Sequence, residues 1–181
     1  LLEEFRLDAH NLDRPLIGIV SRFAPQKGFD LIAGIGHFFE ETDAQLVVLG
    51  SGEWRYVHLF EEWHRWKPRQ IAIWVGYNNP LAHRIEAGAD LFLMPSLYEP
   101  CGLNQIYSLR YGTVPVVRAV GGLDDTIQED TGFKFHEYSV GALYDTLRLA
   151  AGAYRNRDAW TERMRRGMAK DYSWDASARQ Y

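Results

Sequence analysis

Short apolar runs alternate along this chain with stretches in which apolar residues recur at helical spacing. Five runs predict strands, and a short segment, TGFKF (131–135), follows them. The five are residues 16–20, 45–50, 70–76, 90–95 and 114–119. Each run is continuously apolar rather than alternately apolar and polar. That pattern is typical of strands that are buried on both faces of a parallel sheet.

The stretches between and after these runs predict helices, because their apolar residues return every three or four positions. They are residues 28–41, 53–66, 80–89, 103–112, 138–152 and 157–170. Alternation of strands with helices favours an α/β fold with right-handed crossovers. We therefore predict a Rossmann-like, doubly wound parallel sheet of about six strands with helices on both faces. The length, 181 residues, suits a single domain.

Composition and charge exclude several classes of protein. The net charge is −4 and no basic stripe dominates, so we expect no nucleic-acid partner. A single cysteine excludes a disulfide framework and a cysteine-rich zinc site, and favours a reducing compartment. Residues 1–15 lack the basic start and apolar run of a signal peptide. No apolar run approaches the ~20 residues of a membrane span, so we expect a cytoplasmic protein without a membrane partner.

In doubly wound sheets, ligands bind outside the carboxyl ends of the strands, so the loops after the strands carry the information about function. The loop after the first strand, SRFAPQKG, holds Arg22 and Lys27. A guanidinium offers a planar fork for phosphate oxygens and an ammonium a mobile point charge. The pair indicates an anionic ligand. The alternative is a solvated basic loop.

The next two loops give weaker signals. VLGSGEWR, after the second strand, has Arg55 where the last glycine of a dinucleotide fingerprint would stand, and no P-loop motif occurs. A turn at Gly50 still allows a ligand to approach the backbone closely. The loop after the third strand contains Tyr77, which is suited to stacking on a base or a sugar. The alternative for that loop is an ordinary Asn-Pro turn.

The loop SLYEPCGLNQ joins the fourth strand to a helix that begins near Leu103. The first turn of that helix, after Gly102, presents free backbone N–H groups that suit a phosphate. Glu99 would accept hydrogen bonds from sugar hydroxyls a few ångströms away. Its alternative roles are to cap a neighbouring element or to pair with an arginine. Cys101 near a helix start could be a nucleophile, but the sequence shows no His-Asp partnership for it.

Several segments together resemble a known family. They are SRFAPQKGFDLI, VVLGSGE, YEPCGLNQIYSLRYGTVPVVR, the stretch after it through GGLDDTI, and TGFKF. In this order they are similar to the C-terminal domain of bacterial glycogen synthases and plant starch synthases. The similarity runs from about residue 14 to the end of the chain. These enzymes are retaining glycosyltransferases built from two Rossmann domains, the GT-B type.

The resemblance implies that residues 1–181 form a domain that binds a nucleotide-activated glucose, usually ADP-glucose, without a metal or another cofactor. It implies contacts from Arg22 and Lys27 to the diphosphate and from Glu99 to glucose hydroxyls, and these three are the predicted catalytic residues. It makes Cys101 a packing residue. The remaining predicted donor-binding residues are Gly50, Tyr77, Gly102, Leu103, Asn104, Gly121 and Gly122. The family acts in the cytoplasm, or in plastids in plants.

Two departures from the family matter. Many GT-B enzymes carry a second glutamate eight residues after the first, and here Tyr107 stands there, as in glycogen and starch synthases. The family's N-terminal domain, which holds the glucan acceptor, has no counterpart in residues 1–181. We therefore expect no glucan synthesis from this chain alone, and we expect residues 171–181 to pack toward the missing half. The alternatives are a UDP-glucose-dependent retaining enzyme and a non-catalytic nucleotide-binding domain.

Overall fold

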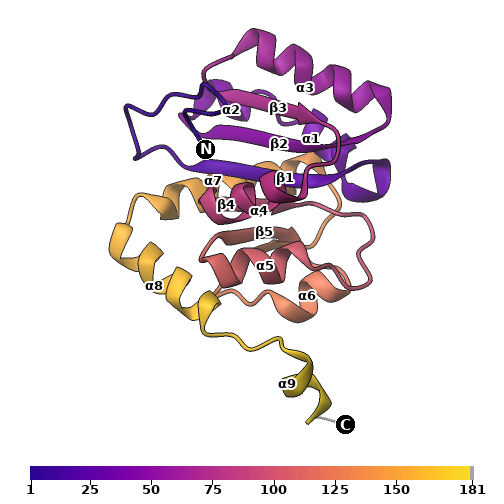
Figure 1. The fold of residues 1–181 in the computed structure, drawn as a ribbon, viewed down its shortest axis with the longest axis vertical. Coiled ribbons are helices and arrows are strands. Elements are labelled where there is room, and N and C mark those ends of the chain that lie inside the picture. Colours follow the sequence, from indigo (N-terminus) through magenta and orange to yellow (C-terminus); the bar gives the residue numbers. More distant parts are fainter. Residues whose placement is uncertain (180–181) are drawn as a thin grey trace.

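A six-stranded sheet in the order β3-β2-β1-β4-β5-β6 forms the centre of the chain (Figure 1). All of its pairings are parallel. In the computed structural model, which describes residues 1–179, the strands are β1 (Leu16–Phe23), β2 (Gln45–Gly52), β3 (Ile71–Val75), β4 (Leu91–Met94), β5 (Val114–Arg118) and β6 (Phe133–Phe135). Since β1 lies between β2 and β4, the chain winds outward in one direction and then in the other. The predicted doubly wound parallel sheet is confirmed.

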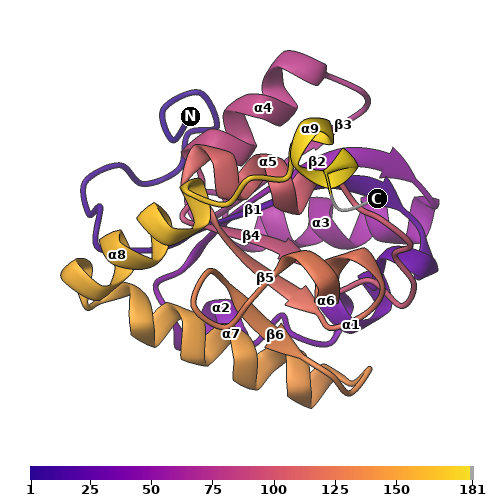
Figure 2. The same cartoon turned by 90° about the horizontal axis from the view of Figure 1, so that it is seen from below.

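Helices cover both faces of this sheet, and Figure 2 shows α4 and α5 on one side with α2 and α7 on the other. The helices of the described residues are α1 (Phe29–Ala33), α2 (Phe38–Glu41), α3 (Trp54–Trp66), α4 (Asn79–Gly88), α5 (Asn104–Tyr111), α6 (Gly122–Thr126), α7 (Val140–Tyr154), α8 (Arg157–Met168) and α9 (Trp174–Ala178), with a 3-10 turn, η1 (Pro25–Lys27). The larger apolar core joins α1, α2, α3 and α7 to the sheet. None of these helices is long and apolar enough to cross a membrane.

Two predicted elements differ from the structure. The helix predicted over 28–41 is broken into α1 and α2 at residues 34–37. Gly34 and Gly36 lie in this break, and glycine lowers helix propensity by about 1 kcal/mol relative to alanine. Helix α6 was not predicted, because five residues are too few to show a helical period.

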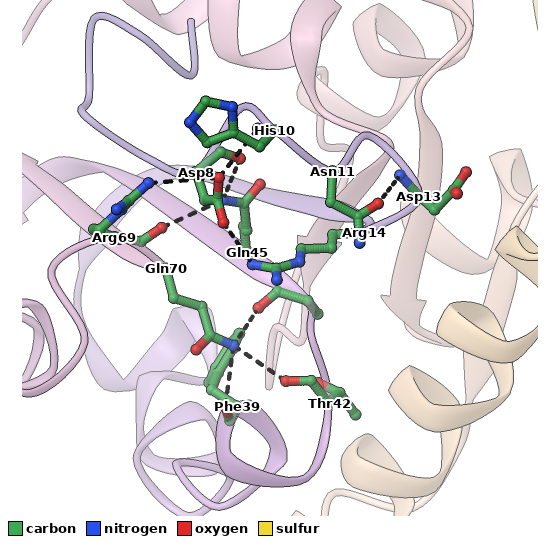
Figure 3. A network of polar contacts seen from close by, with 11 residues as sticks. Asp8, His10, Asn11, Asp13, Arg14, Phe39, Thr42, Gln45, Arg69 and Gln70 are labelled. Atoms are coloured by element: carbon green, nitrogen blue, oxygen red, sulfur yellow. Dashed lines mark hydrogen bonds and ion pairs between the residues drawn. The ribbon is translucent and has the colours of Figure 1, made fainter.

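A polar network holds the N-terminal segment and the loop before β2 against the amino edge of the sheet (Figure 3). The side-chain Nε2 of Gln70 lies within hydrogen-bond distance of three carbonyl oxygens of residues 39–44, at 2.7–3.2 Å. The carboxylate of Asp8 pairs with Arg14 at 3.1 Å and with Arg69 at 3.6 Å. These contacts are structural. The residues with predicted ligand chemistry lie at the opposite, carboxyl edge.

The C-terminal segment leaves the body of the domain after α8 (Figure 1). The Tyr172 hydroxyl donates to the carbonyl oxygen of Thr126 and anchors the segment there. Beyond this anchor, Trp174 of α9 is 90% exposed. Residues 180 and 181 lie outside the described residues. The packing of 171–181 toward a further domain, and the assignment of 1–181 as one donor-binding domain, stay predictions.

Candidate functional site

Two adjoining hollows lie at the carboxyl ends of β1, β2 and β4. The larger, about 340 Å³, is lined by residues from β1, η1 and the loop between β4 and α5. The smaller, about 220 Å³, lies between the ends of β1, β2 and β3. Residues 20–22 and Asn104 line both hollows. They therefore form one continuous cleft beside the point where the winding of the sheet reverses, which is where such folds bind ligands.

The cleft gathers most of the residues singled out from the sequence. The larger hollow contains Arg22, Lys27, Glu99, Gly102, Leu103 and Asn104. The smaller one contains Gly50 and Tyr77, together with Arg22 and Asn104. Gly121 and Gly122 line neither hollow.

Arg22 belongs to β1 itself rather than to the loop after it. The strand was predicted to end at residue 20, but it continues to Phe23, paired along β2 as far as Gly52. The buried Phe23 ring packs edge-on against Phe29, at 5.0 Å between ring centroids, and this contact anchors the end of the strand. Arg22 is consequently held on a sheet strand, with its side chain exposed at the rim of the cleft.

Lys27 and Glu99 meet directly. The Nζ of Lys27 lies 2.5 Å from Oε2 of Glu99, and the same oxygen accepts a bond from the Ser96 hydroxyl at 3.3 Å. The Glu99 side chain is 8% exposed and that of Lys27 is 21% exposed. Glu99 therefore forms an ion pair, as one of the alternatives proposed, but its partner is a lysine rather than an arginine. The pair places both charges inside the larger hollow.

The turn that carries Lys27 is clamped to the loop that carries Glu99. The backbone N–H of Leu97 donates to the carbonyl oxygen of Gln26 at 2.9 Å. In return, the side-chain amide of Gln26 donates to the carbonyl oxygen of Tyr98 at 3.2 Å. These two bonds join segments about 70 positions apart in sequence and hold the turn with Lys27 beside the loop with Glu99.

Helix α5 opens into the same cleft. Its N-cap, Leu103, offers no side-chain hydrogen bond to the first turn, so the backbone N–H groups at the helix start remain available to a ligand. The side-chain amide of Asn104 donates to the carbonyl oxygen of Val20 at 3.0 Å. This bond ties the helix start to the end of β1. The arrangement offers an anion both N–H groups and the positive end of the helix dipole.

Gln105 holds the loop before α5 in shape. Its side chain is fully buried, and its Nε2 lies within hydrogen-bond distance of the carbonyl oxygens of Cys101 (3.1 Å) and Gly102 (3.2 Å) and of the Thr126 hydroxyl (3.2 Å). The amide therefore joins the loop to α6. Gln105 was not identified from the sequence, because a polar residue in the first turn of a helix is ordinary.

Gly121 and Gly122 support that loop from the other side. The N–H of Gly122 donates to the carbonyl oxygen of Glu99 at 3.1 Å. A Cβ at Gly121 would lie 2.2 Å from the same oxygen, and one at Gly122 would lie 2.0 Å from the carbonyl oxygen of Cys101. Only glycine permits this approach. The structure thus gives these glycines a role in backbone packing, and their contact with a donor stays a prediction.

Tyr77 borders the cleft, whereas Cys101 lies on the loop before α5 and lines neither hollow. Tyr77 is 89% exposed at the smaller hollow, so its ring is free to stack on a planar ligand. Cys101 is exposed on the loop, and its Sγ lies 3.4 Å from the carbonyl oxygen of Gly102. Exposure makes Cys101 an accessible thiol rather than a buried packing residue, so the packing role implied by the resemblance does not hold.

A buried acid lies on α4, outside the lining of the cleft. Glu86 is 2% exposed, and its Oε2 lies 3.1 Å from Nδ1 of His83. Burial raises the pKa of the Glu86 carboxyl, and His83 partly opposes this effect. In the described part of the chain no group of three histidine, cysteine or acidic side chains is close enough to hold a metal ion.

The chain is similar in sequence to known proteins. The model of the family "Glycosyl transferases group 1" matches residues 3–167. A glycogen synthase from Koribacter versatilis (strain Ellin345) is 54% identical over 188 aligned positions, which cover 100% of this chain. One from Anaeromyxobacter dehalogenans (strain 2CP-C) is 52% identical over 93% of this chain. The chain spans only 38% and 37% of the length of these two relatives.

Solved structures agree with the fold. The catalytic domain of Starch Synthase IV from Arabidopsis thaliana, bound to ADP and acarbose, superposes with a TM-score of 0.88 at 31% identity, covering 99% of this chain and 39% of that one. Sucrose-phosphate synthase from Thermosynechococcus elongatus shares the fold with a TM-score of 0.76 at 23% identity, over 98% of this chain and 45% of that one. The predicted Rossmann-like domain of the GT-B type is confirmed.

Proposed function

The chain belongs to the glycosyl transferases of group 1, and we propose that it is the donor-binding domain of a glycogen synthase that uses ADP-glucose. The observation that carries the proposal is the convergence of Arg22, Lys27, Glu99 and the start of α5 in one cleft. Two cations and a helix start suit a diphosphate, and a carboxylate suits the hydroxyls of the attached sugar.

In the proposed reaction, the bond between the anomeric carbon of glucose and the diphosphate oxygen breaks, and that carbon bonds with retention to the 4-hydroxyl oxygen at the non-reducing end of a 1,4-α-glucan, whose proton leaves with the ADP. Negative charge grows on the departing ADP. Arg22, Lys27 and the N–H groups at the start of α5 stabilise that charge, which is the task a metal performs in other enzymes. Loss of one such group costs on the order of 10²–10³ in rate. We expect no metal requirement, so chelator should leave ADP binding unchanged.

Binding of the donor tests this proposal directly. Calorimetry with the 181-residue chain should show binding of ADP-glucose and ADP. Lys27→Ala should weaken it by roughly 1.5–3 kcal/mol through a lost charge-assisted contact. Lys170→Ala is the matched control, because Lys170 is exposed and lies outside the cleft. Equal affinity for wild type and Lys27→Ala would refute the role of Lys27.

A nucleotide panel separates the proposal from its alternatives. ADP-glucose should bind more tightly than UDP-glucose. Preference for UDP-glucose would instead indicate a different retaining enzyme of the same fold. Failure to bind any sugar nucleotide would favour a non-catalytic domain and overturn the proposal.

The glucan acceptor should reach this domain only through a further domain, because the chain spans 38% of its glycogen synthase relative. We therefore expect no transfer of labelled glucose to glycogen by the chain alone. Activity should appear when a polypeptide matching the remaining part of the relatives is supplied. Measurable incorporation by the pure 181-residue chain would contradict this expectation.

A further inference from the structure

Lys27 has a partner before any ligand arrives. Its Nζ lies 2.5 Å from Oε2 of Glu99, whose side chain is 8% exposed. The same oxygen accepts a bond from the Ser96 hydroxyl. Within residues 1–179, both side-chain contacts of this carboxylate thus involve the same oxygen, Oε2. The pair lies in a partly buried hollow, where opposite charges attract each other more strongly than in water.

A diphosphate entering that hollow competes with Glu99 for the lysine. Both are anions, and they repel each other at the short distances that a shared cation imposes. One ammonium group has three N–H donors but only one positive charge. Contact between Lys27 and a diphosphate therefore leaves the carboxylate of Glu99 with less compensation than it has in the empty site.

A sugar attached to the diphosphate changes this balance. Its hydroxyl groups are hydrogen-bond donors, and an ionised carboxylate accepts such bonds strongly. We propose that Glu99 discriminates against the free nucleoside diphosphate: it competes for Lys27 when ADP binds alone and releases the lysine when glucose hydroxyls replace it. This inference rests on the proposed function and concerns the selectivity of the same site.

The proposal has a consequence for turnover. Once the glucosyl group has left, Glu99 loses its hydroxyl donors while ADP still occupies Lys27. Re-formation of the Lys27–Glu99 pair then favours departure of ADP. The Lys27–Glu99 ion pair thereby lowers the affinity of the site for the product ADP relative to that for the donor ADP-glucose.

Calorimetry with ADP and ADP-glucose on Glu99→Gln tests the proposal. The amide keeps the shape of the side chain but no longer holds the charge of Lys27. We expect ADP to bind to Glu99→Gln about tenfold more tightly than to wild type. Removing a residue of a binding site usually weakens binding, so the direction of this change is distinctive. ADP-glucose should gain less or lose affinity. Glu129→Gln is the control for net charge, since Glu129 is exposed and precedes β6 at the opposite edge of the sheet.

A double-mutant cycle isolates the competition for Lys27. In the Lys27→Ala background, Glu99→Gln should give little further gain in ADP affinity, because there is no lysine to release. A gain of the same size in both backgrounds would mean simple repulsion by Glu99 and would overturn the proposal. Unchanged or weaker binding of ADP to Glu99→Gln would overturn it as well.

Ser96→Ala provides an independent variant of opposite sign. Without the hydroxyl donor at 3.3 Å, Glu99 depends more on Lys27, so ADP should bind about twofold more weakly while ADP-glucose changes less. Tighter binding of ADP to Ser96→Ala would contradict the proposal. If wild type binds neither ADP nor ADP-glucose, the proposed function itself fails. If it binds both and the variants behave otherwise than expected, only the discrimination fails.

Discussion

The backbone N–H of Gly122 donates to the carbonyl oxygen of Glu99 at 3.1 Å, so the first residue of α6 holds the loop that carries the candidate sugar-binding carboxylate. A side chain at 122 would meet the carbonyl oxygen of Cys101 at 2.0 Å. The two segments cannot separate without moving Glu99 relative to Lys27. The backbone contacts at Gly122 therefore hold this loop together with the side-chain amide of Gln105.

Gly122→Ala should displace this loop. We expect the free energy of unfolding to fall by about 1–3 kcal/mol, the usual range for overpacking a tight site, and the affinity for ADP-glucose to fall with it. Thermal unfolding and calorimetry measure the two effects. Gly152→Ala in α7 is the matched control, because a Cβ there meets nothing within 4 Å. It should raise stability by about 0.5–1 kcal/mol. Unchanged donor affinity in Gly122→Ala would show that the loop tolerates the shift.

Gln105→Glu should destabilise the same loop from the side of α5. A carboxylate has no hydrogen to offer the carbonyl oxygens of Cys101 and Gly102, which would then face an acceptor. We expect a loss of about 1–3 kcal/mol in unfolding free energy and weaker binding of ADP-glucose. Gln128→Glu serves as the control, since the Gln128 amide makes one exposed bond, at 3.3 Å to the carbonyl oxygen of Asp125. Equal melting temperatures for the two variants would argue against the role of Gln105.

Tyr77→Ala should weaken ADP binding, because base stacking on an exposed aromatic ring contributes about 1–3 kcal/mol in other proteins. Tyr77→Phe keeps the ring and should retain most of the affinity. Calorimetry with ADP compares the two variants. If Tyr77→Phe loses as much as Tyr77→Ala, the hydroxyl rather than stacking is the important group.

Cys101 should report occupancy of the cleft. It is the chain's only cysteine and is exposed on the loop between Glu99 and α5, so a maleimide reagent modifies a single site. We expect ADP-glucose to slow the modification several-fold by covering the loop, and glucose alone to leave the rate unchanged. The rate is followed by mass spectrometry of the intact chain. No protection at saturating ADP-glucose would place the donor away from this loop.

Glu86→Gln should stabilise the protein at neutral pH. Burial raises the pKa of Glu86 in the folded state above its value in the unfolded chain. The folded state therefore holds this proton more tightly, and the contribution to stability is full below the unfolded pKa and is lost as pH rises through the folded one. The variant should unfold about 2–4 °C above wild type at pH 7.5 for a gain of roughly 1 kcal/mol, and the difference should shrink at pH 4.5. A constant difference at both pH values would contradict this cause.

Much of the fold and part of the site followed from local patterns. Continuous apolar runs indicated strands buried on both faces, and the rule that ligands bind at their carboxyl ends pointed to Arg22, Lys27 and Glu99. These residues do line one hollow. The helix break at residues 34–37 and the short α6 were missed, because helices of four or five residues have too few positions for a period to appear.

The relationships within the site depended on the tertiary structure. The sequence supplies the types of residue and their order, and so the chemistry that each loop offers. It does not specify which side chains touch, because contacts such as that between Lys27 and Glu99 join segments 72 positions apart and arise only when parallel strands align their ends. Gln26, Ser96 and Gln105 were likewise not identified from their neighbours in sequence. Gln26 reaches a backbone carbonyl of another loop and Gln105 the Thr126 hydroxyl of α6, whereas Ser96 contacts the Glu99 carboxylate within its own loop.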